Sequence, residues 1–151
     1  MPTIEDIQNF RQIRPNLLTA GQPKDTEFDA IRAAGVELVI NLATDHAQDF
    51  NRDEKAIVES LQLRYIHIPV AWDHPTRTDL DRFFEAMDRN KNQKIFVHCA
   101  RNMRVSSFVF LYRVIRNGED PNHCLKDLEA VWQPNSVWAA FIDTNLPPSK
   151  R

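Results

Sequence analysis

A short polar segment between two apolar runs, "HCARNMRVS" at residues 98–106, gathers the side chains most able to do chemistry together. Cys99 directly follows the first apolar run, and Arg104 precedes the second. A loop between a strand and a helix N-terminus binds anions, because free backbone N–H groups and the helix dipole favour negative charge there. The same field stabilises a cysteine thiolate, which is the nucleophilic form of the thiol. The segment therefore predicts an oxyanion site with Cys99 as its nucleophile.

Four neighbours of Cys99 have predicted roles in such a site. Arg104 is a planar cation that suits two phosphate oxygens at once, and a cation in a first helical turn opposes the helix dipole unless an anion binds there. His98 can orient and polarise the cysteine from behind. Asn102 suits the left-handed backbone conformation that such a loop needs and that glycine usually supplies. Arg101 either contacts substrate or is solvated.

Apolar periodicity in the rest of the chain predicts the elements that hold this loop. Strands are expected at residues 16–23, 36–43, 64–72 and 94–99. Helices are expected from Thr3 and at residues 25–35, 52–62, 78–91, 104–118, 121–132 and 135–146, with the helix at 104–118 central because it is apolar on most sides. Alternating strands and helices indicate an α/β fold of three layers, a mainly parallel central sheet flanked by helices, in a single domain over residues 1–151. Ligands of such sheets bind beyond the carboxyl ends of the strands, where Cys99 lies.

Composition narrows the classes of partner. The 151 residues carry a formal net charge of -2 without a long run of one sign, which argues against nucleic acid or a membrane as the partner. The chain has no CxxC or HxxxH spacing, so no metal site and no cofactor are expected. Its second cysteine, Cys124, has no such polar setting and is expected to be structural. The N-terminal segment lacks a signal-peptide pattern, and we expect a cytoplasmic protein.

The loop resembles a known signature. "HCARNMRVS" is similar to the loop of cysteine-dependent protein tyrosine and dual-specificity phosphatases, which reads His-Cys, five residues, Arg, then Ser or Thr. Here four residues separate Cys99 from Arg104, a variant similar to that of a bacterial group of phosphatase-like domains. Residues 17–43 resemble the opening segment of that group, and residues 65–87 resemble the stretch that bears the general acid. The similarity covers most of residues 10–118.

The resemblance implies a two-step hydrolysis of a phosphoprotein or a small phosphate ester, without a cofactor. Cys99 attacks phosphorus to form a phosphocysteine, while Arg104 and the loop amides stabilise the transition state. Asp73 protonates the leaving oxygen and then activates water, with Asp79 and Asp45 as competing acids. Ser106 assists departure of the sulfur. The implied phosphate-binding residues are His98, Ala100, Arg101, Asn102, Met103, Arg104 and Val105.

Departures from the signature keep two alternatives open. Ser106 stands where the signature places its hydroxyl, but Val105 separates it from Arg104, which comes one residue early. The loop has no glycine, and Met103 is bulky. One alternative is a sulfurtransferase of the rhodanese kind. The cysteine loop of those domains is one residue shorter than that of the phosphatases, and this shorter length matches the spacing from Cys99 to Arg104. A phosphate-binding pseudophosphatase with weak turnover is the other alternative.

Overall fold

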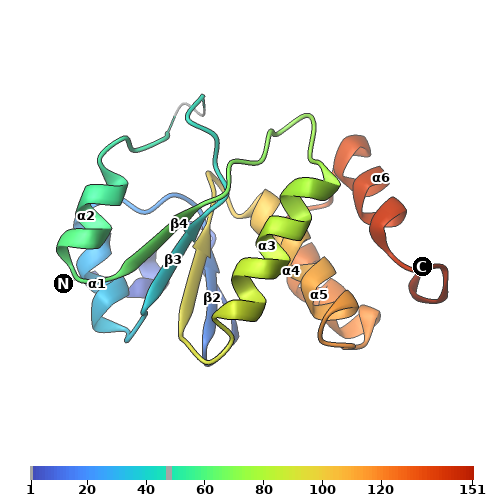
Figure 1. Ribbon diagram of the computed structural model, residues 1–151, viewed down its shortest axis with the longest axis horizontal. Helices are drawn as coiled ribbons and strands as arrows, with labels where there is room; N and C mark the ends of the chain where they lie inside the picture. The colour runs from blue at the N-terminus through green and yellow to red at the C-terminus, as the bar shows by residue number, and fades with distance from the viewer. Residues whose placement is uncertain (1, 47–48) are drawn as a thin grey trace.

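Five strands form one sheet in the computed structural model of the chain, which describes residues 2–46 and 49–151 (Figure 1). Strands β2, β5, β3 and β4 are parallel neighbours in that order, and β1 pairs antiparallel with β2 at one edge. Because parallel strands end at the same edge of a sheet, the loops after these four strands meet there. The strands are β1 (Arg11–Arg14), β2 (Leu17–Ala20), β3 (Leu38–Asn41), β4 (Arg64–His67) and β5 (Ile95–His98).

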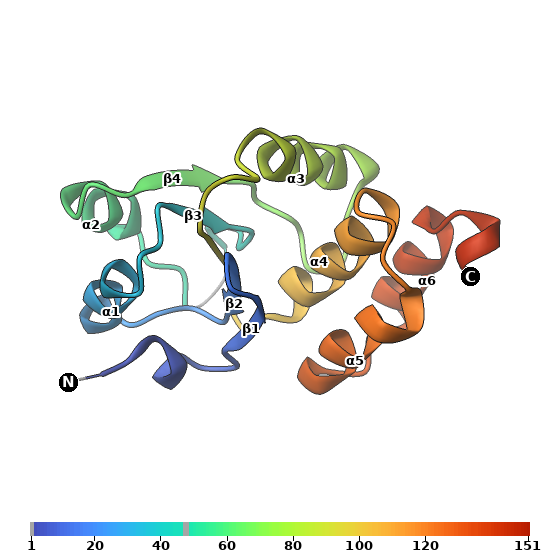
Figure 2. The same cartoon turned by 90° about the horizontal axis from the view of Figure 1, so that it is seen from below.

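The helices cover both faces of the sheet, as the three-layer prediction requires. Helices α1 and α2 lie on one face, and α3 to α6 lie on the other (Figures 1 and 2). No helix within the described part of the chain combines the length and the apolarity needed to cross a membrane. The helices are α1 (Phe28–Ala33), α2 (Glu54–Ser60), α3 (Arg77–Arg89), α4 (Met103–Ile115), α5 (Pro121–Val131) and α6 (Ser136–Asn145), with short 3₁₀ turns at Ile4–Asp6, Asp25–Glu27 and Pro148–Lys150.

The sheet side chains divide between two apolar clusters according to the period of two along each strand. Leu18, Val39 and Phe96 pack with the residues of α1 and α2. Alternate residues of the same strands, such as Ile40 and Val97, pack with α3 to α6. Strands buried on both faces are nearly continuous apolar runs. This is why β3 and β5 could be located from the sequence alone.

Helix α4 is the central helix on its face of the sheet. Every residue from 104 to 114 is buried, and the Phe108 ring lies 5.7 Å from that of Phe83 and 5.9 Å from that of Trp138. This packing gives the N-terminus of α4, where the polar loop ends, a fixed position against the sheet.

The observed structure adds one strand and shortens several predicted elements: the helix expected from Thr3 is the 3₁₀ turn Ile4–Asp6, and the strand expected at 16–23 is Leu17–Ala20. Strand β1 was not predicted, because "RQIR" is polar and half exposed and is held only by its pairing with β2. The predicted strand at 64–72 ends at His67, since Pro69 has no N–H to donate to a ladder. The backbone continues beside β3, however, through hydrogen bonds from Ile68 and Val70 N–H to Asn41 and Leu42.

A cluster of ion pairs ties the edge of the sheet to the helices beside it. Arg11 of β1 and Arg113 of α4 each donate to the Asp127 carboxylate of α5 at 2.7 Å. Burial acts to raise the pKa of Asp127, but the hydrogen bonds from Arg11 and Arg113 outweigh it and hold the pKa below its ordinary value of 3.8. A lowered carboxyl pKa stabilises the folded state above the ordinary value, and this stability is lost as the pH falls through the lowered pKa.

We predict that Asp127→Asn lowers the free energy of unfolding at neutral pH by about 1–3 kcal/mol, between the values for surface and buried ion pairs. The difference from the wild type should shrink as the pH falls from 3.8 through the lowered pKa of Asp127, because only below that lowered pKa is the folded wild-type carboxylate itself protonated. Urea unfolding at several pH values measures this. Asp81→Asn, which removes an exposed pair with Arg77, is the matched control and should have little effect. If Asp127→Asn lowers the free energy of unfolding by the same amount at every pH, the ion pairs are not the source of the stability.

Candidate active site

A cavity of about 520 Å³ opens at the carboxyl edge of the sheet. Its walls come from the loops after β3, β4 and β5 and from the first turn of α4, all on the edge that the sequence predicted. A second cavity, of about 350 Å³, lies at the opposite end of the strands, and no cysteine lines it. The residues that line the first cavity, called the active-site pocket below, are Thr44, His46, Ala71, Trp72, Asp73, Cys99, Ala100, Arg101, Met103 and Arg104.

Cys99 lies on the floor of the active-site pocket, directly after β5. Its side chain is almost fully buried, and its thiol is free. The loop that follows it leads directly into the first turn of α4, which begins at Met103. Cys124 is also buried, but it lies in α5 away from this pocket, and burial raises the pKa of its thiol. Of the two cysteines, only Cys99 lines the active-site pocket.

Asn102 supplies the left-handed residue of the loop. Its backbone has φ 67° and ψ 0° at the position that precedes α4, which confirms the conformation predicted in place of a glycine. The side chain is buried behind the loop, and its Nδ2 donates to the Asn9 carbonyl at 2.8 Å and to Thr19 Oγ1 at 3.1 Å. These bonds help to offset the conformational cost that a non-glycine residue has there.

Arg104 is a buried cation without a carboxylate partner. It is 5% exposed, and among the described residues no carboxylate lies within 4.0 Å of it. Its Nη1 donates to the Val70 carbonyl at 2.8 Å, and its Cζ lies 6.0 Å from the centre of the Trp72 ring. A buried charge without a counter-ion is costly, which makes Arg104 the candidate anion-binding side chain of this pocket.

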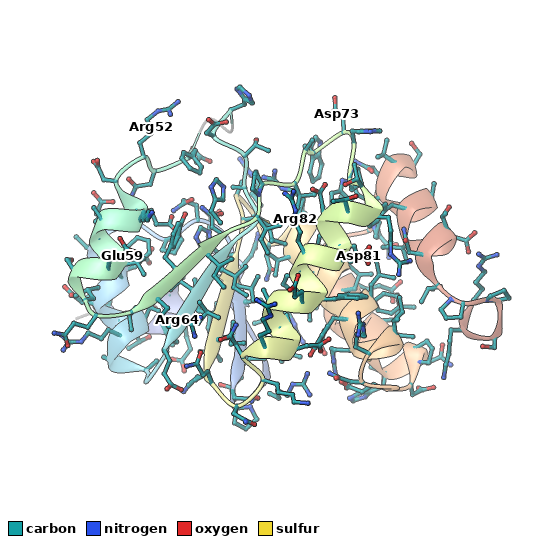
Figure 3. The ribbon with its side chains drawn as sticks, in the orientation of Figure 1. Arg52, Glu59, Arg64, Asp73, Asp81 and Arg82 are labelled. Atoms are coloured by element: carbon teal, nitrogen blue, oxygen red, sulfur yellow. The ribbon has the colours of Figure 1, made fainter. Side chains whose placement is uncertain are left out.

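Trp72 and Asp73 form the outer rim of the pocket. Trp72 is 42% exposed, and its ring lies tilted against those of Trp132 and Trp138, so it both lines the pocket and covers the core. Asp73 is exposed, and its side chain projects away from the sheet in Figure 3. Of the two competing acids, Asp79 caps α3 by accepting from the Thr76 N–H, and Asp45 does not line the pocket.

Four predicted site residues lie behind or beside the pocket. His98 and Asn102 are fully buried beneath the loop, and Val105 is part of the apolar core. The Ser106 hydroxyl donates to the Met103 carbonyl at 2.9 Å. Ser106 lines a separate small cavity that Cys124 also lines, so the structure does not bring its hydroxyl into the active-site pocket. Ala100, Arg101 and Met103 do line the pocket with Cys99 and Arg104.

The sequence did not predict that Glu54 belongs to this site. Glu54 is fully buried at the start of α2 and its Oε2 lies 2.5 Å from His98 Nε2. Its Oε1 accepts from Gln22 Nε2 at 2.8 Å. Glu54 precedes the buried Val58 by four residues, so both side chains lie on the inward face of α2. This spacing is the sequence signal that could have predicted the burial of Glu54. Gln22 belongs to the "GQP" segment at residues 21–23, which directly follows β2.

The segment after β2 holds the loop from its other side. Gly21 and Arg101 form an isolated antiparallel bridge, and the Gln22 N–H donates to the Ala100 carbonyl at 3.0 Å. A methyl group added at Gly21 would lie 2.7 Å from the Ala100 oxygen and 2.8 Å from Gln8 Cγ. This close approach of two backbones explains the glycine and shows that the "GQP" segment positions the loop.

Two comparisons place this geometry among known proteins. The chain matches over residues 2–138 a family model described as "DSP-PTPase phosphatase fused to NAD+ kinase". None of the curated proteins matches the chain. A phosphatase-like protein of the group DUF442 from Shewanella putrefaciens CN-32 is 33% identical to the chain, with a TM-score of 0.86, and the alignment covers 94% of this chain and 93% of that one.

More distant solved structures share the fold. The core catalytic domain of the PP-IP phosphatase SIW14 from S. cerevisiae has a TM-score of 0.76 at 13% identity, covering 95% of this chain and 88% of that one. TpbA from P. aeruginosa in complex with pTyr has a TM-score of 0.66 at 17% identity, covering 80% and 72%. At these identities the likeness extends to the fold alone.

We predict that Gly21→Ala displaces the loop and slows alkylation of Cys99 by iodoacetate several-fold, because the new methyl group overlaps the Ala100 carbonyl. The free energy of unfolding should fall by roughly 1–3 kcal/mol, the range for overpacked sites. Mass spectrometry follows the two cysteines separately, and Cys124 should stay unmodified in both proteins.

Gly118→Ala is the control for the conformational cost of losing a glycine. Gly118 has φ +65° but no atom within 4 Å of an added methyl group. The variant should lose about 1 kcal/mol of stability and keep the wild-type rate of Cys99 alkylation. Equal alkylation rates in the Gly21 and Gly118 variants would show that Gly21 does not position the loop.

Proposed function

Because the chain belongs to the family of dual-specificity and protein tyrosine phosphatases, we propose that it hydrolyses phosphoric monoesters through a phosphocysteine intermediate. The observation that carries this proposal is the buried guanidinium of Arg104, which lines one pocket with the Cys99 thiol and lacks a carboxylate partner in the described chain. A nucleophile and an unpaired cation at a helix N-terminus suit attack on a dianionic phosphoryl group.

In the first step the Cys99 thiolate attacks phosphorus, an S–P bond forms, and the bond from phosphorus to the leaving oxygen breaks. Asp73 gives its proton to that oxygen. Arg104 is held through Nη1 by Val70, which leaves its other N–H groups for the equatorial oxygens. In the second step Asp73 takes a proton from water, the water oxygen bonds to phosphorus, and the sulfur leaves as thiolate. We assign no step to Ser106, whose hydroxyl is bound to Met103.

The position of Asp73 implies a movement during this cycle. Its side chain projects away from the sheet in Figure 3, on the exposed loop between β4 and α3. The loop must turn this side chain inward when substrate binds, as loops of many enzymes do on closure. Asp73 lies beside Trp72, so the indole ring would cover the substrate in the same movement.

The proposed substrate is a phosphoprotein or a small phosphate ester whose organic part lies against Trp72 and Met103, in a pocket lined by both. One structural neighbour is named as a PP-IP phosphatase and another is in complex with pTyr, which supports a phosphate ester as the substrate class. A nucleophilic thiolate needs a reducing compartment, and the proposed location is therefore the cytoplasm.

A weakly active, phosphate-binding protein is the second candidate function. The outward position of Asp73 favours it, because binding needs Arg104 and the loop but not a general acid. The only remaining support for a sulfurtransferase is the spacing from Cys99 to Arg104. An assay of sulfur transfer from thiosulfate to cyanide tests this alternative directly.

We predict that the purified protein hydrolyses an aryl phosphate and that Cys99→Ser abolishes turnover. Arg104→Lys should lower kcat by roughly 10²–10³-fold, the range for the loss of a transition-state hydrogen-bond donor. The assay is release of phosphate under reducing conditions, with Cys124→Ser as a control that keeps the wild-type rate. Binding of inorganic phosphate without turnover would favour the second candidate, and turnover by Cys99→Ser would exclude the phosphocysteine mechanism.

The dependence of the rate on pH tests the role of Asp73. The reaction needs Cys99 deprotonated and the general acid protonated, so kcat/KM should fall on both sides of an optimum. Asp73→Asn should lose the basic limb and lower kcat by about 10²–10⁴-fold. Asp79→Asn, which alters only the cap of α3, should keep the basic limb. A basic limb that persists in Asp73→Asn at full rate would remove Asp73 from the mechanism.

A further inference from the structure

We propose that Glu54 is a positioning residue for Cys99: it holds a second proton on His98 and so keeps an imidazolium cation directly behind the nucleophile. The inference deepens the proposed function, because it concerns how the same cysteine is kept reactive. It rests on hydrogen bonds among three segments that meet beneath the loop, namely the end of β5, the start of α2 and the turn after β2.

The pair formed by Glu54 and His98 is withdrawn from solvent. The side chains are 1% and 0% exposed, and the carboxylate Oε2 lies 2.5 Å from His98 Nε2. The other carboxylate oxygen accepts from Gln22 Nε2, which also donates to the Pro23 carbonyl. Since both partners of the Gln22 amide nitrogen are acceptors, the orientation of this amide is fixed. Glu54 is thus bound through both oxygens.

The hydrogen bonds of His98 determine how many protons the pair carries. Nδ1 lies 3.2 Å from the carbonyl oxygen of Cys99. A carbonyl only accepts, so Nδ1 carries a proton. Nε2 faces a carboxylate oxygen, and two lone pairs cannot face each other at this distance, so a second proton lies between Nε2 and Glu54. The pair therefore has no net charge, as a buried pair requires.

We assign the shared proton to His98, which makes the pair an imidazolium and a carboxylate. The donated hydrogen bond from Gln22 to Glu54 Oε1 favours the ionised carboxylate. Tyr65 of β4 is the other titratable group near Glu54. Burial first, and then the negative charge of Glu54, raise its pKa to about 12, so that Tyr65 remains neutral.

The consequence for Cys99 is electrostatic and geometric. The pair has no net charge, but its positive ring is bound to the Cys99 peptide through Nδ1, and the carboxylate lies at the opposite ring nitrogen. The positive end of this dipole therefore faces the start of the loop, in surroundings where charges are little screened. The same hydrogen bond from Nδ1 to the Cys99 carbonyl orients the peptide at the start of the loop. Without Glu54, His98 would be buried as a neutral ring, and a source of thiolate stabilisation would be lost.

Nitrogen NMR of the ¹⁵N-histidine-labelled wild type tests the protonation state directly and needs no turnover. Both ring nitrogens of His98 should have the shifts of protonated imidazolium at neutral pH. In Glu54→Gln, which keeps the size of the side chain, they should have the shifts of a neutral tautomer. A neutral His98 in the wild type at neutral pH would overturn the inference, whatever the enzymatic activity.

The rate of Cys99 alkylation by iodoacetamide, a neutral reagent, tests the effect on the thiol. Glu54→Gln should lower this rate at neutral pH by about tenfold and move its rise to higher pH, and where turnover is measurable the acidic limb of kcat/KM should move in the same direction. Glu27→Gln is the matched control: Glu27 is also a buried glutamate, but it binds the Lys24 N–H and not His98. An unchanged pH dependence of alkylation in Glu54→Gln would overturn the inference. A protein that fails to hydrolyse phosphate esters yet shows the imidazolium and the shift would disprove the proposed function alone.

Discussion

The organisation of this site depends on one buried cation. Arg104 is placed by the first turn of a fully buried helix and held by the Val70 carbonyl, and the described chain offers it no carboxylate. A buried charge is tolerated when an anion neutralises it. Arg104 lines the same pocket as the Cys99 thiol. The parallel arrangement of β2, β5 and β3 is what makes this possible, because it brings their loops to the helix N-terminus.

The loop from Cys99 to Arg104 has one residue fewer than the signature it resembles, and its conformation is held by contacts from outside it. Asn102 takes the left-handed conformation and is tied to Asn9 and Thr19. Gly21 and Gln22 bind the loop backbone on one side. The buried pair of His98 and Glu54 supports it from beneath. The conformation of this short loop without glycine thus depends on segments that are far away in the sequence.

The sequence predicted those features that local pattern determines, and missed those that depend on contacts between distant segments. The family resemblance is confirmed by the match over residues 2–138 and by the Shewanella structure. The central position of α4 followed from its apolar composition, and the left-handed Asn102 from its place before a helix. Glu54 was missed because its partner His98 is 44 residues away, and a glutamate in an amphipathic helix is usually solvated. The position of the Ser106 hydroxyl depends on its bond to Met103, which residue spacing does not reveal.

The central claim is that Cys99 itself carries the phosphoryl group during turnover. The most direct measurement is rapid acid quenching of the wild-type protein during hydrolysis of an aryl phosphate, followed by mass spectrometry of its peptides. We expect a phosphoryl adduct on the peptide that contains Cys99, with greater accumulation in Asp73→Asn when an activated phosphate ester supplies a good leaving group. Turnover without any adduct on Cys99, or with the phosphoryl group on another residue, would contradict it.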